Sequence, residues 1–335
     1  MVSRSGVLPS RPAVIGIHCR LVAAWALLAI AVAAPAQEAF PGRKPIEFIV
    51  LFPAGSSADV TARLLAEGVA KHLGTNIVVV NRPGGGGAVG YKYAAAQAAD
   101  GHHLVWNSNS ISTTHHIGML PFDYRAFTPV ARVQNETPLL FVRNEAPWKS
   151  LRDIVQQAQA QPGKLTIGNS GTGSHTHFSS VWLFRATGAR VVDVPFNAAQ
   201  VVPGLLGGHV DAVVQLPGAL AGLVKSGNVR ALVALSAVRD PAFPEVPTAR
   251  ELGVNAAAEL WRGVAAPRGT PSRVVARLED AIRRAVESPE FVRASEKLLV
   301  TPAFLPAAEF GKLIAKEDAE IAQAVKTLGL RPDSK

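Results

Sequence analysis

The feature that most constrains the fold is a repeated alternation between short apolar runs and stretches of helical length. After Arg132 the alternation starts again, so each half of the chain carries its own set. Continuous apolar runs are typical of strands buried on both faces, and a β-then-α order predicts doubly wound, parallel sheets. The predicted strands are 48–52, 76–80, 103–106, 139–142, 165–168, 191–194, 212–214 and 231–234, and the predicted helices are 58–73, 91–99, 150–161, 174–187, 271–287 and 306–328. Further helical stretches are expected between the last three strands.

A chain of 335 residues is too long for one ordinary domain and suits two lobes, each with its own core. Its 48% hydrophobic and 18% charged residues are typical of a packed globular protein. We expect 37–132 to form the first part of lobe 1, 133–236 to form lobe 2, and 237–335 to return to lobe 1. The return would run through the proline-rich stretch 239–271. More than one crossing between the lobes predicts a cleft between them.

Residues 1–36 have the pattern of a secretory signal peptide. Arg4, Arg11 and Arg20 precede an apolar run at 21–34 that is too short to span a bilayer. The tripeptide APA that ends at Ala36 fits a small-x-small cleavage site. We expect the signal peptide to be removed near Ala36 and the mature protein to reside in the periplasm. A retained membrane anchor is the alternative.

Cysteine content and charge narrow the class of ligand. The only cysteine, Cys19, lies in the leader, so the mature chain has no thiol for a disulfide, a nucleophile or a zinc site. The formal net charge is +9, and +6 once the three arginines of the leader are subtracted. Basic runs and basic–aromatic interleaving are absent, so we expect no nucleic-acid partner. A diffuse positive charge attracts small anions.

Two matching turns, one in each half, form the strongest candidate site: PAGSSAD at 53–59 and SGTGS at 170–174. Each follows an apolar strand, consists mainly of small residues and opens a helix. Small residues let the backbone approach a ligand, and the free amides and dipole of a helix start favour an anion. In open α/β sheets, ligands lie at the carboxyl ends of strands. The alternative is that Ser57 and Ser174 are plain N-caps, but two equivalent turns favour a ligand.

Other motifs give weaker signals. Gly85-x-Gly87-x-x-Gly90 formally matches a dinucleotide fingerprint, but it does not directly follow a strand and lacks an acidic residue about twenty positions on. We interpret it as a flexible loop before a helix and expect no cofactor. His175 and His177 would diverge at a helix start, and the sequence holds neither H-E-x-x-H nor G-x-S-x-G. We therefore expect no metal site and no catalytic residue.

A series of blocks in fixed order carries a family resemblance. They include LFPAGSSAD at 51–59, NRPGGGGAVG at 81–90, GTGSHTH at 171–177, LLGGHVD at 205–211 and AAPRGTP at 265–271. From about 45 to 332 the chain resembles the periplasmic binding proteins of tripartite tricarboxylate transporters, also called the Bug family. The resemblance implies a type II periplasmic-binding-protein fold: two doubly wound α/β lobes, joined by crossing strands, with a ligand cleft between them.

The resemblance also implies which residues bind the ligand. In this family, backbone amides and hydroxyls of the two turns hold the ligand's carboxylate. Carried over to this chain, these residues are Ala54, Gly55, Ser56, Ser57 and Asp59 from one lobe and Gly171, Thr172, Gly173 and Ser174 from the other. The full candidate set also includes Phe52, Asn107, Ser108, Ser170, Asn197 and Gln215.

Several residues depart from the family pattern. Ser56 and Ala58 replace a usual glycine and a usual threonine. The segment 194–198 reads VPFNA and lacks the tyrosine and lysine of the usual VPYKG, and Gln215 stands where an aspartate is common. Because these changes affect the outer pocket, the resemblance does not transfer one specific ligand to this chain.

The turns and the resemblance together predict a periplasmic solute receptor, not an enzyme. It would deliver a small carboxylate to integral membrane transporter subunits and act as a monomer. The ligand would be a di- or tricarboxylate, an acidic amino acid or an aromatic acid. One alternative is an exported sensor that feeds a signalling kinase. The other is an exported hydrolase or lyase that uses the same cleft, but the sequence lacks an assembled nucleophile and base.

Overall fold

The structure, a computed structural model, describes residues 1–2, 6 and 40–330. The chain divides into a unit from Met1 to Ala39 and a unit from Phe40 to Lys335, and every helix and strand below belongs to the second. The strands form two sheets. They are β1 (Ile46–Val50), β2 (Ile77–Asn81), β3 (His103–Ser108), β4 (Phe127–Glu136), β5 (Leu139–Arg143), β6 (Thr166–Asn169), β7 (Val192–Pro195), β8 (Ala212–Gln215), β9 (Val229–Ala234), β10 (Leu260–Pro267) and β11 (Thr301–Pro306).

The two sheets share one topology. Sheet A has the order β11-β4-β10-β3-β1-β2, and sheet B has the order β7-β6-β8-β5-β9. In each sheet, three parallel strands are followed by one antiparallel strand, β10 in sheet A and β5 in sheet B. That strand is the one that enters from the other sheet, since β5 follows β4 and β10 follows β9 in the chain. We call the half built on sheet A lobe 1 and the half built on sheet B lobe 2.

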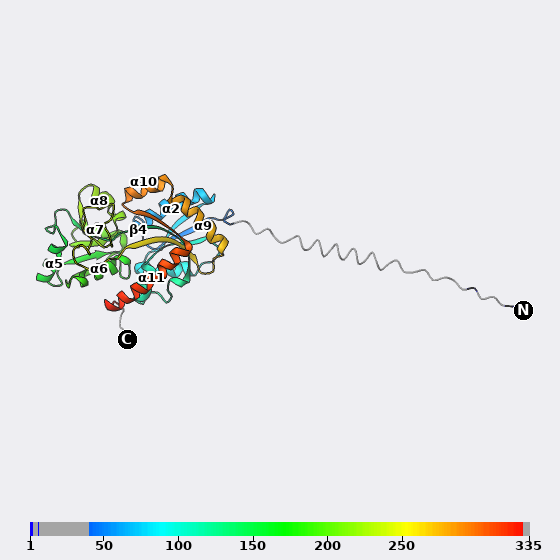
Figure 1. Cartoon of the computed structure of the whole chain (residues 1–335), viewed down its shortest axis with the longest axis horizontal. Coiled ribbons are helices and arrows are strands. Elements are labelled where there is room, and N and C mark those ends of the chain that lie inside the picture. The colour runs from blue at the N-terminus through cyan, green and yellow to red at the C-terminus, as the bar shows by residue number, and fades with distance from the viewer. Residues whose placement is uncertain (3–5, 7–39, 331–335) are drawn as a thin grey trace. The chain divides into compact units, whose positions relative to one another are not determined.

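Helices cover both faces of each sheet. They are α2 (Ser57–Leu73), α3 (Ala88–Ala95), α4 (Ser110–His116), α5 (Leu151–Ala160), α6 (His175–Ala186), α7 (Val201–Leu206), α8 (Ala221–Lys225), α9 (Ser272–Val286), α10 (Pro289–Leu298) and α11 (Ala307–Thr327), with short 3₁₀ turns η1 (Gly85–Gly87), η2 (Tyr124–Ala126), η3 (Ala198–Gln200) and η4 (Pro217–Ala219). Figure 1 shows α5 to α8 on one side, α2 and α9 on the other, and β4 between them.

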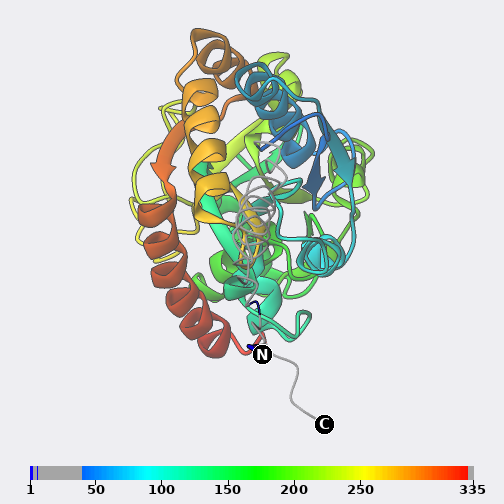
Figure 2. The ribbon, with the colours of Figure 1, turned by 90° about the vertical axis from the view of Figure 1, so that its right-hand side faces the viewer.

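Alternation along the strands sets up a core on each face. In sheet A, Phe48 packs with α2 and α9 on one face, while its neighbour Ile49 packs with α3 and α11 on the other. Figure 2 shows α2 beside α9, with α11 following below α9 along the same side. In sheet B, Leu140 and Phe141 divide the two faces in the same way. Burial on both faces explains why these strands read as continuous apolar runs.

The fold class predicted from the sequence is confirmed: two doubly wound α/β lobes with strands that cross between them. The strands β4, β10 and β11 and the helices α4 and α10 were not predicted, and α7 and α8 were expected only as helical stretches without bounds. The expectation of purely parallel sheets was also wrong, because β10 and β5 run antiparallel to their neighbours. β10 lies inside the stretch that was interpreted only as a return connection. Strand polarity depends on which lobe a segment comes from, and local sequence carries little information about that.

The predicted signal peptide and its cleavage site near Ala36 lie outside the described residues, apart from positions 1, 2 and 6. The predicted limit at 132 falls inside β4, and the limit at 236 falls two residues after β9. None of the helices that the structure describes combines the length and apolar character needed to cross a membrane.

Candidate functional site

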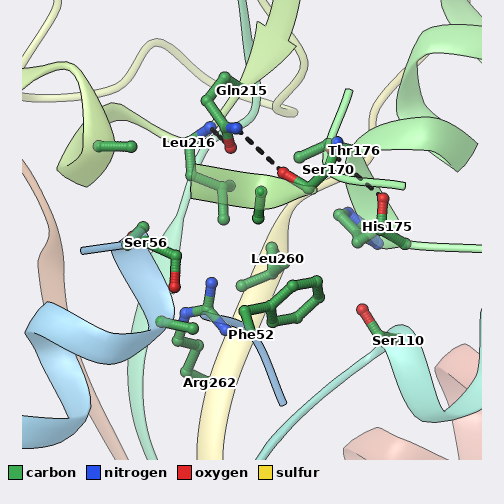
Figure 3. Close-up of a pocket in the computed structure, with 15 residues that line it drawn as sticks. Phe52, Ser56, Ser110, Ser170, His175, Thr176, Gln215, Leu216, Leu260 and Arg262 are labelled. Atoms are coloured by element: carbon green, nitrogen blue, oxygen red, sulfur yellow. Dashed lines mark hydrogen bonds between the residues drawn. The ribbon is translucent and has the colours of Figure 1, made fainter. Parts of the chain in front are cut away.

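A cavity lies between the carboxyl-terminal ends of corresponding strands in the two lobes. We call it the inner cavity, and both matching turns contribute to its wall (Figure 3). Its lining residues from lobe 1 are Phe52, Ser56, Ser57, Ala58, Ser110, Leu260 and Arg262, and those from lobe 2 are Ser170, Ser174, His175, Thr176, Ala198, Gln215, Leu216 and Ala219. Its volume is about 20 Å³. One water needs roughly 10–15 Å³, so the cavity admits only a small head group in this conformation.

The helices α2 and α6 both begin at this cavity. Each follows the first strand of its three-stranded parallel set, so the two starts occupy equivalent positions. Ser56 caps α2 by accepting a hydrogen bond from the Asp59 amide at 3.3 Å, and Ser174 caps α6 by accepting one from the His177 amide at 3.2 Å. The cap of α2 is therefore Ser56, not Ser57 as the alternative interpretation of the turn had it.

The first amides of both helices are available to a ligand. Within the described residues, the N–H groups of Ser57 and Ala58 in α2 and of His175 and Thr176 in α6 have no hydrogen-bond acceptor. All four residues line the inner cavity. Helix starts leave such donors unpaired and carry a partial positive charge. Four donors from two helices can therefore converge on one anionic group.

The first turn is braced by a carboxylate from its own lobe. Asp59 accepts hydrogen bonds from the Gly55 amide at 3.0 Å, from Asn81 Nδ2 at 2.9 Å and from Arg63 Nε at 3.0 Å. Burial alone would raise the pKa of Asp59, but these hydrogen bonds outweigh it and hold the pKa below its usual value. Asp59 therefore stays ionised and fixes the turn.

The second turn is held partly by the opposite lobe. Within lobe 2, the Ser170 amide donates to Thr176 Oγ1 at 2.9 Å. From lobe 1, Thr113 Oγ1 donates to the Gly173 carbonyl at 2.8 Å. Gly86 packs so closely that a Cβ there would lie 2.6 Å from the Thr172 carbonyl oxygen. The glycine stretch that was interpreted as a flexible loop therefore forms a turn that contacts lobe 2.

An outer pocket of about 410 Å³ adjoins the inner cavity and shares Phe52, Ser170 and Ala198 with it. Backbone and uncharged side chains form its wall. The remaining lining residues are Pro53, Pro83, Gly84, Gly85, Gly86, Gly87, Met119, Gly171, Thr172, Pro195, Phe196 and Asn197. The two compartments together offer a narrow polar end and a wider, uncharged end.

Gln215 fixes the hydroxyl of Ser170 at the boundary between the compartments. Its Nε2 donates to Ser170 Oγ at 3.0 Å, while its Oε1 accepts from the Leu216 amide at 2.8 Å (Figure 3). Both functions of the amide are therefore used. An aspartate could accept from the Leu216 amide but could not donate, so Gln215 sets the Ser170 hydroxyl differently from the common family residue.

His175 lines the inner cavity in its neutral form. Its Nε2 lies 2.7 Å from the Ala258 carbonyl, so this nitrogen must carry the proton. Burial lowers the pKa of His175 to about 4, because charging the ring would require desolvation. At neutral pH the ring therefore contributes no charge to the cavity.

The structure places the predicted site residues in three groups. Phe52, Ser56, Ser57, Ser170, Ser174 and Gln215 line the inner cavity, and Gly171, Thr172 and Asn197 line the outer pocket. Ala54, Gly55, Asp59, Asn107, Ser108 and Gly173 line neither. Ala54 and Gly55 are exposed, and Asn107 Oδ1 accepts from Tyr91 Oη at 2.8 Å inside lobe 1.

Sequence reasoning missed Arg262, the one charged side chain that lines the inner cavity. It lies on β10 and only 3% of its side chain is exposed. Its Nε donates to Glu136, which also accepts a hydrogen bond from Ser57 Oγ. A signal did exist, because an arginine interrupts an otherwise apolar run at 260–267. Without β10 as a predicted strand, that signal had no structural setting.

The fold and the two-sided cavity define a class: a two-lobed solute receptor. The family model described as "Tripartite tricarboxylate transporter family receptor" matches residues 61–330. BugT of Bordetella pertussis is 34% identical over 308 residues, which cover 90% of this chain and 94% of that protein. The chain therefore belongs to the tripartite tricarboxylate transporter receptor family, the Bug family, as the sequence blocks indicated.

Solved structures agree with this assignment. The periplasmic binding protein BugD is similar with a TM-score of 0.82 and 26% identity, covering 87% of this chain and 99% of that one. An R. palustris protein solved with adipate has a TM-score of 0.81 and 27% identity over 87% of this chain and 98% of that one. MatC from Rhodopseudomonas palustris, solved with bound malate, has a TM-score of 0.79 and 29% identity over 85% and 100%.

Proposed function

We propose that this protein captures a small carboxylate between its lobes and delivers it to the membrane subunits of a tripartite tricarboxylate-type transporter. It would work in the periplasm as a monomer after removal of the signal peptide near Ala36. The cleft would bind without catalysing a reaction and without a cofactor or a metal. The adipate and malate bound by two similar structures support a carboxylate as the ligand class.

The observation that carries this proposal is the convergence of two equivalent helix starts on one cavity. The free amides of Ser57, Ala58, His175 and Thr176 come from both lobes. A hydrogen bond to a charged acceptor contributes about 1.5–3 kcal/mol, and each helix end adds roughly 0.3–1 kcal/mol. After the entropy of capture, a few such bonds are enough for a micromolar dissociation constant, about −8 kcal/mol.

We further propose how the predicted residues divide their work. Ser56, Ser57, Ser170 and Ser174 surround the carboxylate head group, while Gly171, Thr172 and Asn197 contact the body of the ligand in the outer pocket. Ala54, Gly55 and Asp59 would act indirectly, by holding the first turn in shape. Asn107 and Ser108 would support the floor of lobe 1.

Because the inner cavity is small and enclosed by both lobes, binding must favour the closed arrangement. Isothermal titration calorimetry tests the proposal with malate, citrate, adipate, glutamate and benzoate, which represent the expected ligand classes. We expect at least one acid to bind with a micromolar or lower dissociation constant. Small-angle scattering with that acid should show a smaller radius of gyration.

Native mass spectrometry of freshly purified protein complements the titrations, because a co-purified small acid would identify the ligand directly. If none of the five acids binds and no small acid co-purifies, the proposed function is wrong. Tight binding with unchanged scattering would retain the receptor but contradict closure around the ligand.

A further inference from the structure

Arg262 has an unusual position for a purely structural arginine. It is the only charged residue among those that line the inner cavity, and its residue surface is 2% exposed. Figure 3 shows its guanidinium pointing into the cavity between Ser56 and Leu260. A buried arginine is expected to have a partner for each end of its guanidinium, because an unpaired buried donor is costly.

Only one end of this guanidinium has a partner within the described residues. Nε donates to Glu136 Oε1, and the pair is almost fully buried, with side-chain exposures of 3% and 0%. Nη1 is buried and has no hydrogen-bond partner within the described residues. The guanidinium that carries this nitrogen is the part of Arg262 that Figure 3 shows at the cavity.

Glu136 binds the Nε side of the Arg262 guanidinium. It lies on β4, next to β10 in sheet A, and it does not line the cavity. Its oxygens accept from Ser57 Oγ and, at 3.1 Å, from Gln134 Nε2, so it is fixed from several directions. This arrangement anchors the Nε side of Arg262 and leaves the opposite side for another acceptor.

We infer that Arg262 binds the anionic head group of the ligand, with Glu136 as its positioning residue. The inference rests on the proposed function and specifies it. A carboxylate would enter the narrow inner cavity, accept from the Arg262 guanidinium and from the helix-start amides, and extend the rest of the ligand into the outer pocket. Arginine suits this role, because its planar fork matches a carboxylate.

The same geometry limits the ligand class. The inner cavity of about 20 Å³ takes a head group but not the body of an acid. The outer pocket of about 410 Å³ has no charged side chain among its lining residues. The preferred ligand therefore presents one carboxylate to Arg262 and a neutral or apolar portion to the outer pocket.

The test uses the mature protein with the double substitution Arg262→Gln and Glu136→Gln. Replacing both ions avoids leaving one buried charge unpaired, which would itself destabilise the fold. Calorimetry or competition titration then compares the tightest-binding acid of the five named above with its fully amidated, uncharged analogue. We expect the acid to lose at least about tenfold in affinity, while the affinity for the uncharged analogue changes less than about threefold.

Arg132→Gln is the matched control. Arg132 lies on β4 in the same sheet, is partly buried and donates to the Ala303 carbonyl at 2.8 Å, but it lines neither compartment. It should leave the affinity for the acid within about threefold of the original value. Equal losses for the acid and its uncharged analogue in the double variant would make Arg262 a structural residue and overturn the inference. An unchanged affinity for the acid would overturn it as well.

This outcome is separable from the proposed function. If the unmodified protein binds an acid and the double variant binds it equally well, the proposed receptor function is retained and the proposed role of Arg262 is wrong. If the unmodified protein binds none of the acids, the proposed function and the role of Arg262 are both wrong. A thermal unfolding curve for each variant establishes that the protein measured is folded, and Arg262→Lys with Glu136 intact provides a second folded variant. We expect this lysine variant to recover only part of the affinity for the acid, because an ammonium lacks the fork.

Discussion

The two turns occupy equivalent positions in the two sheets, yet they are held in place differently. The hydrogen bonds that brace the first turn come from lobe 1 itself, through Asp59 and Asn81. The second turn receives a hydrogen bond from Thr113 of the opposite lobe and lies against Gly86 of that lobe. Packing alone does not separate the turns, because a Cβ at Gly218 of lobe 2 would lie 2.7 Å from Ser57 Oγ in the first turn. The difference is in the hydrogen bonds: those of the first turn come from its own lobe, whereas the second turn also accepts one from the opposite lobe.

This difference assigns the two turns different tasks. A turn that is fixed within its own lobe presents its amides in both the open and the closed arrangement. A turn that also accepts a hydrogen bond across the cleft couples ligand contact to closure, because the bond from Thr113 to the Gly173 carbonyl exists only when the lobes approach. We expect changes near the first turn to alter local stability and changes near the second to alter closure.

The largest expected effect concerns His175, the first residue of α6, whose counterpart in α2 is Ser57. The folded pKa of about 4 lies below the ordinary value of 6.5. As the pH falls, the unfolded chain binds the proton first, so stability is lost progressively from about pH 6.5 to pH 4. At about 1.36 kcal/mol per unit, the loss is on the order of 3 kcal/mol. Urea denaturation at a series of pH values measures it.

His175→Gln is the control for this prediction. A glutamine can donate to the Ala258 carbonyl but does not titrate, so the loss between pH 6.5 and 4 should shrink in this variant. If the slope of the free energy of unfolding against pH is unchanged in that range, His175 does not control the acid sensitivity.

Asp59 acts in a different pH range. Because its pKa in the folded protein is depressed, the stability that its ionised form contributes is lost only as the pH falls below the ordinary value of 3.8.

The second prediction concerns Gly86→Ala, which tests closure. The new Cβ would lie about 2.5 Å from the Ser174 amide nitrogen and 2.6 Å from the Thr172 carbonyl oxygen, so the lobes could not approach as observed. Overpacking of this kind costs roughly 1–3 kcal/mol, which corresponds to about five- to 150-fold in affinity. Calorimetry should show that loss, and scattering should show a larger radius of gyration with ligand present.

A control must share the backbone strain of this substitution but not the clash. Gly163 has a φ of 73°, close to the 62° of Gly86, and a Cβ there would meet nothing within 4 Å. Gly163→Ala should lower stability without changing affinity. A loss of affinity in Gly163→Ala as large as that in Gly86→Ala would attribute the effect to strain and would contradict the closure argument.

Much of the fold could be predicted from the sequence, because buried strands and amphipathic helices leave local patterns. The eight predicted strands each overlap a strand of the structure. β10 escaped prediction since its apolar run is interrupted by Arg262 and lies among prolines. The turns were found from their small residues. Arg262 was not found, because its place at the cavity depends on its ion pair with Glu136, which lies 126 positions away in the sequence.

The same limit applies within the turns. Small residues and a following helix identified both of them, and the pattern pointed to the amides at each helix start, while the family resemblance added Gly55 and Gly171. In the structure, the Gly55 amide donates to Asp59 and the Gly171 amide donates to Asn169 Oδ1 at 3.1 Å. The unpaired amides belong instead to the first two residues of each helix. Which amide stays free depends on side chains that fold back, and a motif does not record that.

The third prediction compares the turns at one matched position. Gly55 and Gly173 have φ values of 79° and 83°, so alanine strains the two backbones to a similar degree. A Cβ at Gly55 meets nothing within 4 Å, whereas one at Gly173 lies 2.7 Å from Ile117 Cδ1 and Met119 Sδ in lobe 1. Gly173→Ala should weaken binding by about 1–2 kcal/mol more than Gly55→Ala, measured by calorimetry on the same acid. Equal effects would remove the distinction between the turns.

The smallest expected effect is that of Asp59→Asn in the first turn. The asparagine can still accept from the Gly55 amide, but it loses the ion pair with Arg63, whose Nη2 lies 2.9 Å from the Asp59 carboxylate. Arg63 is half exposed, which screens the pair, so we expect a loss of only about 1 kcal/mol in the free energy of unfolding. Affinity for the acid should change less than about threefold, since Asp59 lines neither compartment. Arg63→Gln should give a similar loss by removing the same pair from its other side. Either substitution could instead lower the affinity for the acid tenfold without changing the free energy of unfolding. In that case the Asp59 carboxylate acts on the ligand, and its role is not limited to bracing the first turn.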